Sequence, residues 1–196
     1  MGRLDGTKTL VNLMKAFAGE SQARNRYTFF ASVANKEGYR QIEAFFMETA
    51  DNECEHAKLF YGALVKGVDK LPATVEITGT FPVELRTTYD NLLSGAAGEH
   101  EEWTDLYFNW GRVAEAEGFA DIASIFKEVS EVEERHEARY IKLAENIKEN
   151  KVFHREEEVA WKCRNCGYVH EGPDAPAVCP CCKHPRAYFE LFMVNY

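Results

Sequence analysis

Two short motifs in the sequence pair a carboxylate with an imidazole at helical spacing. They are Glu53-x-x-His56 and Glu133-x-x-His136. Residues three positions apart lie on the same face of an α-helix, so each motif presents its two side chains together. Apolar residues share that face, and a charged pair buried among them is costly unless it binds something. Carboxylate and imidazole ligands in this combination indicate iron or manganese rather than a metal that prefers thiolates.

Further acidic residues fall on the inward faces of two other predicted helices. Glu20 lies on an apolar face of the first helix, and Glu99 and Glu102 lie on an apolar face of the third. With the two motifs they match the ligand pattern of di-iron and di-manganese four-helix bundles. Glu102 exceeds that pattern and is either an extra ligand or a rim residue facing solvent. Tyr27 and Tyr107 are either hydrogen-bond donors to ligand carboxylates or core aromatics.

A second candidate metal site consists of two Cys-x-x-Cys pairs. Cys163 and Cys166 form the first pair, and Cys179 and Cys182 follow after twelve residues. Two such turns supply four thiolates to one tetrahedral metal, and zinc and iron both fit the spacing. Cys181 lies inside the second pair and is the spare thiol by this register.

Four long amphipathic helices are the elements that must position the carboxylates and imidazoles. The apolar periodicity predicts them over about 7–37, 40–66, 86–117 and 120–148. The segment 67–85 contains glycines and prolines and is long enough to cross a bundle from end to end. We therefore expect two helical hairpins joined by a long crossover.

The two predicted hairpins repeat each other. Glu53 and Glu133 are 80 positions apart, whereas Glu20 and Glu99 are 79 apart. A slip of one residue inside a helix can be absorbed by a π-bulge, and such bulges are frequent at functional sites. The sequence therefore predicts a π-bulge in the helices that carry these glutamates.

The helical periodicity stops after about residue 150. The remaining chain is rich in cysteine, proline, glycine and aromatic residues, which indicates a small β domain that depends on a metal for stability. We therefore expect a mainly α chain with a four-helix bundle over 1–150 and a small β domain over 151–196.

Charge and hydropathy restrict the partners and the location of the chain. The net charge of −9 argues against nonspecific binding to nucleic acid or anionic membranes, because both require a basic face. No apolar run approaches the ~20 residues that span a bilayer, and no signal-peptide core is present, so a cytoplasmic protein is expected. Tight cysteine pairs suit metal binding in a reducing compartment. Cys54 is expected to pack as a small apolar residue.

Taken together, the motifs resemble the rubrerythrins over essentially the whole chain. The resemblance implies a ferritin-like di-iron bundle followed by a rubredoxin-like domain, with three irons per chain. The residues that carry it are Glu20, Glu53-x-x-His56, Glu99-x-x-Glu102, Glu133-x-x-His136, Cys163-x-x-Cys166-Gly-Tyr and Cys179-Pro-x-Cys182-x-His-Pro.

The same resemblance implies a role for each expected catalytic ligand. The four paired cysteines would hold a single rubredoxin-type iron that passes electrons on. The di-iron ligands would be Glu53 and Glu133 as bridges, Glu20 and Glu99 as terminal ligands, His136 on the second iron, and Glu102 and His56 as alternative ligands of the first iron in its oxidised and reduced forms.

The activity implied is reduction of hydrogen peroxide to water in oxidative stress defence. Electrons would come from NAD(P)H through partners such as rubredoxin and its reductase, and the chain would act as a head-to-tail homodimer or higher homo-oligomer. The sequence has no Gly-rich dinucleotide fingerprint, so NAD(P)H is expected to bind the separate reductase. Three alternatives stay open: a ferroxidase or iron-storage protein, an oxygen-reducing di-iron protein, and a zinc-stabilised binding module.

Overall fold

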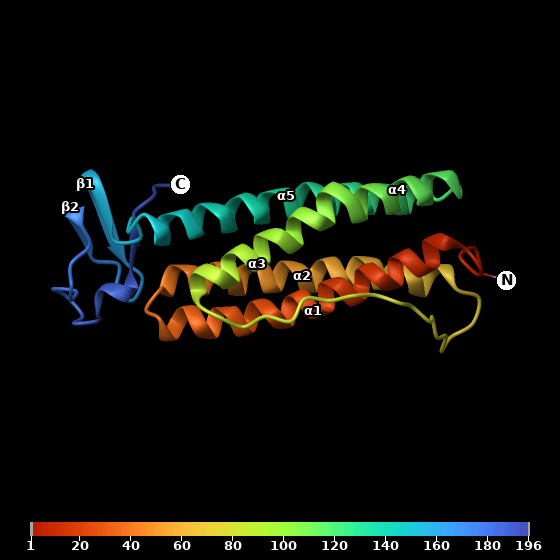
Figure 1. Ribbon diagram of the computed structural model, residues 1–196, viewed down its shortest axis with the longest axis horizontal. Coiled ribbons are helices and arrows are strands. Elements are labelled where there is room, and N and C mark those ends of the chain that lie inside the picture. The colour runs from red at the N-terminus through yellow and green to blue at the C-terminus, as the bar shows by residue number, and fades with distance from the viewer. Residues whose placement is uncertain (1, 196) are drawn as a thin grey trace.

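The computed structural model describes residues 2–195 and shows a long helical bundle with a small sheet domain at one end (Figure 1). The four predicted helical stretches are confirmed within the described residues. Two hairpins pack together, the first made of α1 and α2 and the second of α3 to α5. Their bounds are α1 Lys8–Lys36, α2 Arg40–Gly67, α3 Thr88–Glu101, the π-helix η1 Glu102–Leu106, α4 Tyr107–Ala116 and α5 Ala120–Lys148.

Apolar side chains at helical spacing form two separate clusters inside the bundle. One cluster contains Tyr27, Phe46 and Tyr140, and the other contains Phe60 and Phe126. All of these rings are buried. The buried glutamates of the site lie on the same helices, between the positions that contribute to the two clusters. The apolar faces therefore hold the helices together on both sides of a polar centre.

The π-helix η1 accounts for the slip in the sequence repeat. Tyr27 lies seven positions after Glu20, but Tyr107 lies eight positions after Glu99. The five residues of η1 lie between Glu99 and Tyr107, so the wider turn absorbs the additional residue. The predicted π-bulge is therefore confirmed.

Each hairpin turn caps the first helix of the other hairpin. The carboxylate of Glu117 accepts hydrogen bonds from the backbone N–H of Lys8 at 3.0 Å and of Thr9 at 2.8 Å. Glu37, its counterpart in the repeat, accepts a hydrogen bond from the N–H of Thr88 at 2.9 Å. A carboxylate at a helix N-terminus satisfies free N–H groups and opposes the helix dipole.

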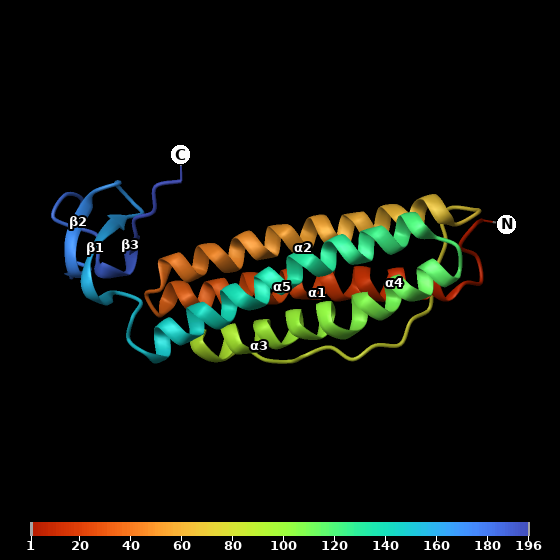
Figure 2. The same cartoon turned by 90° about the horizontal axis from the view of Figure 1, so that it is seen from above.

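The crossover between the hairpins, residues 68–87, runs along the outside of the bundle without regular secondary structure (Figures 1 and 2). Residues 78–84 lie over the groove between α1 and the second hairpin, because they line one pocket together with side chains of both. The crossover therefore covers one long face of the bundle.

A three-stranded antiparallel sheet follows the bundle, in the order β2-β1-β3. It packs against the turn between α1 and α2, where the Tyr39 and Phe153 rings stack with centroids 6.3 Å apart. The guanidinium of Arg40 lies over the Tyr188 ring, 4.8 Å from its centroid. The strands are β1 His154–Cys163, β2 Val169–Asp174 and β3 Phe189–Leu191, with a short 3-10 helix η2 Arg186–Tyr188 before β3.

This architecture confirms the predicted mainly α fold with a small β unit. Within residues 2–195, no helix has both the length and the apolar character needed to cross a membrane.

Candidate metal centre

Four glutamates and two histidines from four helices meet in the middle of the bundle. Glu20 comes from α1, Glu99 from α3, Glu53 and His56 from α2, and Glu133 and His136 from α5. The four glutamates are fully buried, His136 is 2% exposed and His56 is 8% exposed. The structure thus brings together six of the seven residues that the sequence predicted for this site, and places His56 nearest the surface.

Two overlapping groups of ligand atoms are present at this centre. In each group one atom from every residue lies within 4.8 Å of the others. Glu53 and Glu133 belong to both groups, which is the arrangement expected of carboxylates shared by two metals. The first group is Glu20, Glu53, His56 and Glu133, and the second is Glu53, Glu99, Glu133 and His136.

The two imidazoles face the shared carboxylates. His56 Nδ1 is 2.9 Å from Glu53 Oε2 and 2.8 Å from Glu133 Oε1. His136 Nδ1 is 3.2 Å from Glu53 Oε1 and 2.8 Å from Glu133 Oε2. Each histidine therefore presents Nδ1 to the centre of the site.

Several buried polar atoms at this centre have no well-directed hydrogen bond among the described residues, although the facing imidazoles and carboxylates approach some of them closely. Such an atom costs about 1–3 kcal/mol when it is left unsatisfied, and more when it is charged. A pair of cations between the carboxylates would satisfy all of them at once, so the donor set fits a di-iron centre. The atoms are Glu20 Oε2, Glu53 Oε1, Glu99 Oε2, both Glu133 oxygens and His136 Nδ1.

Proton affinities at the centre reflect burial and crowding of negative charge. Burial, followed by the charges of neighbouring glutamates, raises the pKa of Glu20 and Glu99 well above its ordinary value. Burial alone would raise the pKa of Glu53, but the two imidazoles lower it to about 2. Burial alone would lower the pKa of the histidines, but the facing carboxylates raise it to about 10 for His56 and about 9 for His136. Binding of divalent cations would therefore release protons.

The two tyrosines are donors to the outer carboxylates, and they act across the hairpins. Tyr27 of α1 donates a hydrogen bond to Glu99 Oε1 on α3, and Tyr107 of α4 donates one to Glu20 Oε1 on α1. Burial and nearby glutamates raise the pKa of both phenols well above its ordinary value, which keeps them protonated. Of the two interpretations that the sequence left open, hydrogen bonding to the carboxylates is confirmed.

Asn52 supports the site although the sequence analysis did not identify it. Its Oδ1 lies 3.3 Å from His136 Nε2. A hydrogen bond from Nε2–H to this oxygen would leave Nδ1 unprotonated and facing the carboxylates. Asn52 belongs to no motif and reaches His136 only through the packing of α2 on α5, so a periodicity argument could not find it.

Glu102 lies outside both groups of ligand atoms. It is half-buried and begins the π-helix. Its carboxylate lies near α1, since a methyl group placed on Gly19 would be 3.8 Å from Glu102 Oε1. Burial, followed by the charges of Glu133 and Glu53, raises the pKa of Glu102 well above its ordinary value. The structure therefore places Glu102 beside the centre rather than within either group.

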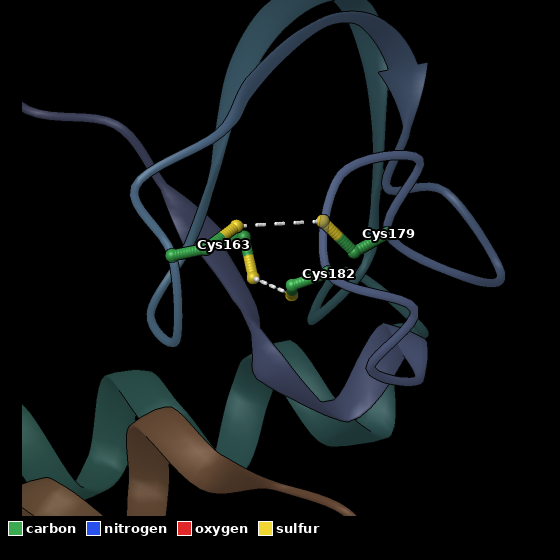
Figure 3. A group of neighbouring side chains, drawn as sticks. Cys163, Cys179 and Cys182 are labelled. Carbon is green, nitrogen blue, oxygen red and sulfur yellow. Dashed lines mark hydrogen bonds between the residues drawn. The ribbon is translucent and has the colours of Figure 1, made fainter.

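Four cysteines of the sheet domain form the second candidate site. Cys163 Sγ is 3.7 Å from Cys182 Sγ, and Cys166 Sγ is 3.7 Å from Cys179 Sγ. Figure 3 shows the labelled sulfurs turned toward a common centre between two loops. The backbone N–H of His184 contributes most to lowering the pKa of Cys182, to about 5. Four thiolates in this arrangement fit a single tetrahedral iron.

The two cysteine turns have the same backbone hydrogen bonds. The N–H of Gly167 donates to the carbonyl of Cys163 at 2.8 Å, and the N–H of Lys183 donates to the carbonyl of Cys179 at 3.0 Å. Cys181 is exposed, as expected for a spare thiol. Cys54 is exposed as well. The expectation that it packs as an apolar residue was wrong, because it lies on the outer face of α2, one residue past the buried Glu53.

Comparison with known families agrees with both sites. The Rubrerythrin family model matches residues 12–144, and the model for the rubrerythrin rubredoxin-like domain matches residues 161–190. The chain belongs to the rubrerythrin family. A rubrerythrin of this kind combines a di-iron centre with an Fe(Cys)4 centre, and the carboxylate–histidine and cysteine clusters fit these two centres.

Rubrerythrins from several organisms resemble the chain over its full length. Rubrerythrin-1 of Clostridium acetobutylicum is 54% identical over 100% of both chains. The rubrerythrin of Porphyromonas gingivalis is 53% identical over 98% of this chain and 94% of its own. A solved structure of partially reduced nigerythrin is 31% identical, with a TM-score of 0.64 over 96% of this chain and 90% of that chain. These relatives establish the family and the ferritin-like bundle.

Proposed function

We propose that this rubrerythrin is a peroxide reductase that acts in oxidative stress defence. It would reduce hydrogen peroxide to water with electrons delivered through the Fe(Cys)4 centre. The observation that carries the proposal is the presence, in one chain, of a buried carboxylate–histidine site and a four-thiolate site. A ferroxidase or an iron-storage protein requires the first site but has no use for an electron-transfer centre.

The shared and unshared carboxylates support a division of roles among the ligands. When bound, the iron pair supplies two electrons at one place, which is the number consumed when one O–O bond is broken. The ligands proposed are Glu53 and Glu133 as bridges, Glu20 and Glu99 as terminal ligands, His136 on the second iron, and His56 on the first iron with Glu102 as its alternative.

Residues around the ligands hold them in position. Tyr27 and Tyr107 each fix one oxygen of an outer carboxylate, which leaves the other oxygen free for metal. Asn52 orients His136. Apolar clusters lie on both sides of the centre and shield its buried carboxylates from water along the bundle axis. A site shielded in this way strengthens electrostatic interactions with the reacting oxygens.

The two centres are far apart within one chain. The sheet domain contacts α2 at Arg40, and Glu53 lies thirteen residues further along the helix, or about 20 Å at the helical rise. We infer a division near residue 150 into a bundle, 1–150, and an electron-transfer domain, 151–196. A head-to-tail homodimer or higher oligomer would bring the cysteine iron of one copy closer to the pair in another. We propose rubredoxin, reduced by its NAD(P)H-dependent reductase, as the electron donor. We propose the cytoplasm as the location of the reaction.

The test is peroxide consumption under single-turnover and steady-state conditions. Iron-loaded protein should contain about three irons per chain, and its reduced form should consume about one peroxide per iron pair. Cys182→Ser removes one proposed ligand of the Fe(Cys)4 centre and should keep the single turnover while losing most steady-state turnover with a protein donor. Cys181→Ser, one residue away, is the matched control and should behave as the unmodified protein.

Two results would contradict the proposal. If Cys182→Ser turned over at the unmodified rate with the same donor, the cysteine metal would be structural. If the reduced protein consumed oxygen or deposited iron while leaving peroxide intact, an oxidase or ferroxidase function would be favoured instead.

A further inference from the structure

A pocket of 860 Å³ lies between α1, the second hairpin and the crossover. Small residues of α1 and α3, among them Ala16, Gly19 and Gly98, form part of its wall and leave it wide. Phe81 and its neighbours in the crossover contribute the opposite wall. Figure 1 shows the crossover running in front of α1 over this part of the bundle.

The pocket adjoins the carboxylate–histidine centre through two of its lining residues. Glu102 and Tyr107 both line it, and Tyr107 donates its hydrogen bond to Glu20 at the centre itself. A molecule in the pocket would therefore contact the polar groups that adjoin the proposed first iron.

The size of the pocket exceeds the needs of hydrogen peroxide. Water occupies about 30 Å³ in the liquid, and peroxide is only slightly larger. Pockets for organic ligands span about 300–1,000 Å³ and are mainly apolar with a few polar groups. Phe81, Leu106 and Trp110 supply apolar and aromatic walls here, and the charged side chains of Lys15, Glu84 and Glu101 complete the lining. The dimensions and the lining therefore suit an organic molecule.

One charged side chain on the pocket wall, Arg26, carries a hydrogen-bond donor without a partner among the described residues. Arg26 Nη1 is buried and has no hydrogen-bond partner among residues 2–195. The same guanidinium donates from Nε to Gln22 Oε1 at 2.7 Å and lies over the Tyr27 ring, 5.6 Å from its centroid, so it is held in place. The guanidinium of Arg26 therefore places a positive charge at the pocket wall, which favours an oxygen atom of a ligand there.

We propose that this pocket binds apolar organic hydroperoxides and that the adjoining centre reduces them to alcohols. The proposal rests on the proposed peroxide reductase function. In the reaction, the O–O bond of ROOH breaks, two electrons come from the reduced iron pair and two protons come from solvent, giving ROH and water. Phe81, Leu106 and Trp110 hold the organic group, and Arg26 donates to an oxygen of the hydroperoxide.

The test compares the reduction of two substrates, cumene hydroperoxide and hydrogen peroxide, by the same iron-loaded full-length protein. The protein should convert cumene hydroperoxide to cumyl alcohol, measured by chromatography. Ala97→Phe narrows the pocket from α3 and should lower the ratio of kcat/KM for cumene hydroperoxide to that for hydrogen peroxide about tenfold. Leu93→Phe, on an exposed position of the same helix outside the pocket, is the matched control and should leave the ratio unchanged.

A binding measurement separates occupancy from turnover. Calorimetric titration of the oxidised protein with cumyl alcohol should show binding that Ala97→Phe weakens about tenfold and Leu93→Phe does not. Arg26→Met should also weaken it, because the free donor is lost.

The outcomes distinguish this proposal from the function on which it rests. Reduction of hydrogen peroxide without reduction of cumene hydroperoxide would overturn the pocket proposal and leave the peroxide reductase intact. An unchanged ratio in Ala97→Phe, or alcohol binding that no pocket variant alters, would overturn it as well. Failure with both peroxides would overturn the proposed function.

Discussion

The glutamates at and beside the centre differ in the number of metal positions that each one faces. Glu53 and Glu133 contribute to both groups of ligand atoms, while Glu20 and Glu99 contribute to one each. Glu102 contributes to neither and lies beside Gly19 instead. Loss of a shared carboxylate should therefore affect both metals, whereas loss of Glu102, the proposed alternative ligand of the first iron, should affect that iron alone.

Replacing Glu53 or Glu133 with Ala should abolish the spectroscopic signal of the di-iron pair, because each faces both metal positions. The absorbance of the Fe(Cys)4 centre should remain, since it lies in the other domain. Glu102→Ala is the comparison variant. It should retain all iron, but its rate of peroxide turnover should change. Iron analysis and visible spectra measure the outcome, and full peroxide activity in Glu133→Ala would show that other residues form the site.

Gly95 is a position where one methyl group should disturb both packing and the centre. A Cβ there would lie 3.0 Å from two carbons of the Tyr140 ring and 3.5 Å from Tyr27 Cε1. Both rings are buried, and Tyr27 holds Glu99. Gly95→Ala should therefore lower the free energy of unfolding by about 1–3 kcal/mol.

Gly98→Ala provides the control for this substitution in the same helix. A Cβ on Gly98 meets only Arg26 Nη2 at 3.6 Å, which is an ordinary contact. The gain in helix propensity, about 1 kcal/mol, should make Gly98→Ala neutral or stabilising. Thermal unfolding of both variants measures the difference, and equal stability would show that the Tyr140 ring can shift freely.

Residue types and spacing were sufficient to predict the six carboxylate and imidazole side chains that the structure brings together. They were not sufficient for Asn52, whose role depends on contact with His136, a residue 84 positions away on another helix. They also misplaced Cys54, because the outward direction of a helical position is set by its rotation relative to neighbours rather than by its hydropathy.

At the scale of elements, the π-helix aligns the second hairpin with the first. The additional residue between Glu99 and Tyr107 is accommodated in η1, so Tyr107 still reaches Glu20 just as Tyr27 reaches Glu99. The sequence predicted this bulge because a repeat with a constant offset exposes a single slip. It could not predict that the tyrosines pair across the hairpins, since that depends on how the helices pack.

Glu117 should contribute stability that depends on pH. Burial alone would raise the pKa of Glu117, but its hydrogen bonds to Thr9 and Lys8 together lower it below its ordinary value. A lowered pKa in the folded state means that the stabilisation is present above the unfolded pKa and is lost as pH falls through the folded value. Glu117→Ala should therefore cost about 1–2 kcal/mol at pH 7 and progressively less below about pH 4.

Urea unfolding at several pH values measures this effect. Glu115→Ala, an exposed position near the same helix end, is the control and should change stability little at any pH. A cost for Glu117→Ala that stays constant between pH 7 and pH 3 would show that the carboxylate charge is not involved.

At the scale of the whole molecule, the sheet domain is attached by a small contact. Tyr39 stacks on Phe153 and Arg40 lies over Tyr188, both at the turn between α1 and α2. Sequence composition predicted two units but not this docking, because contacts between surface aromatic residues leave no periodic pattern. The four helices carry their own cores and their own ligands.

A chain truncated after Asn150 should therefore fold and bind its iron pair. Chemically reduced, it should consume about one peroxide per pair, but it should lose most steady-state turnover with a protein donor. Adding the separate sheet domain should restore turnover only weakly, since covalent linkage supplies a high effective concentration. Circular dichroism verifies the fold, and an undiminished steady-state rate would exclude the cysteine iron from the electron path.

The exchange of helix caps between the hairpins makes the two halves of the repeat interdependent. Glu37 accepts a hydrogen bond at the N-terminus of α3, in the second hairpin. Glu117 accepts one at the N-terminus of α1, in the first hairpin. In a chain cut within the crossover and separated into halves, the N–H groups of Lys8, Thr9 and Thr88 would lose their carboxylate partners, and each half would keep only half of the proposed metal ligands. The halves look like duplicated copies in sequence, yet neither copy should persist alone. The bundle should melt in a single cooperative transition, with no state in which one half stays folded.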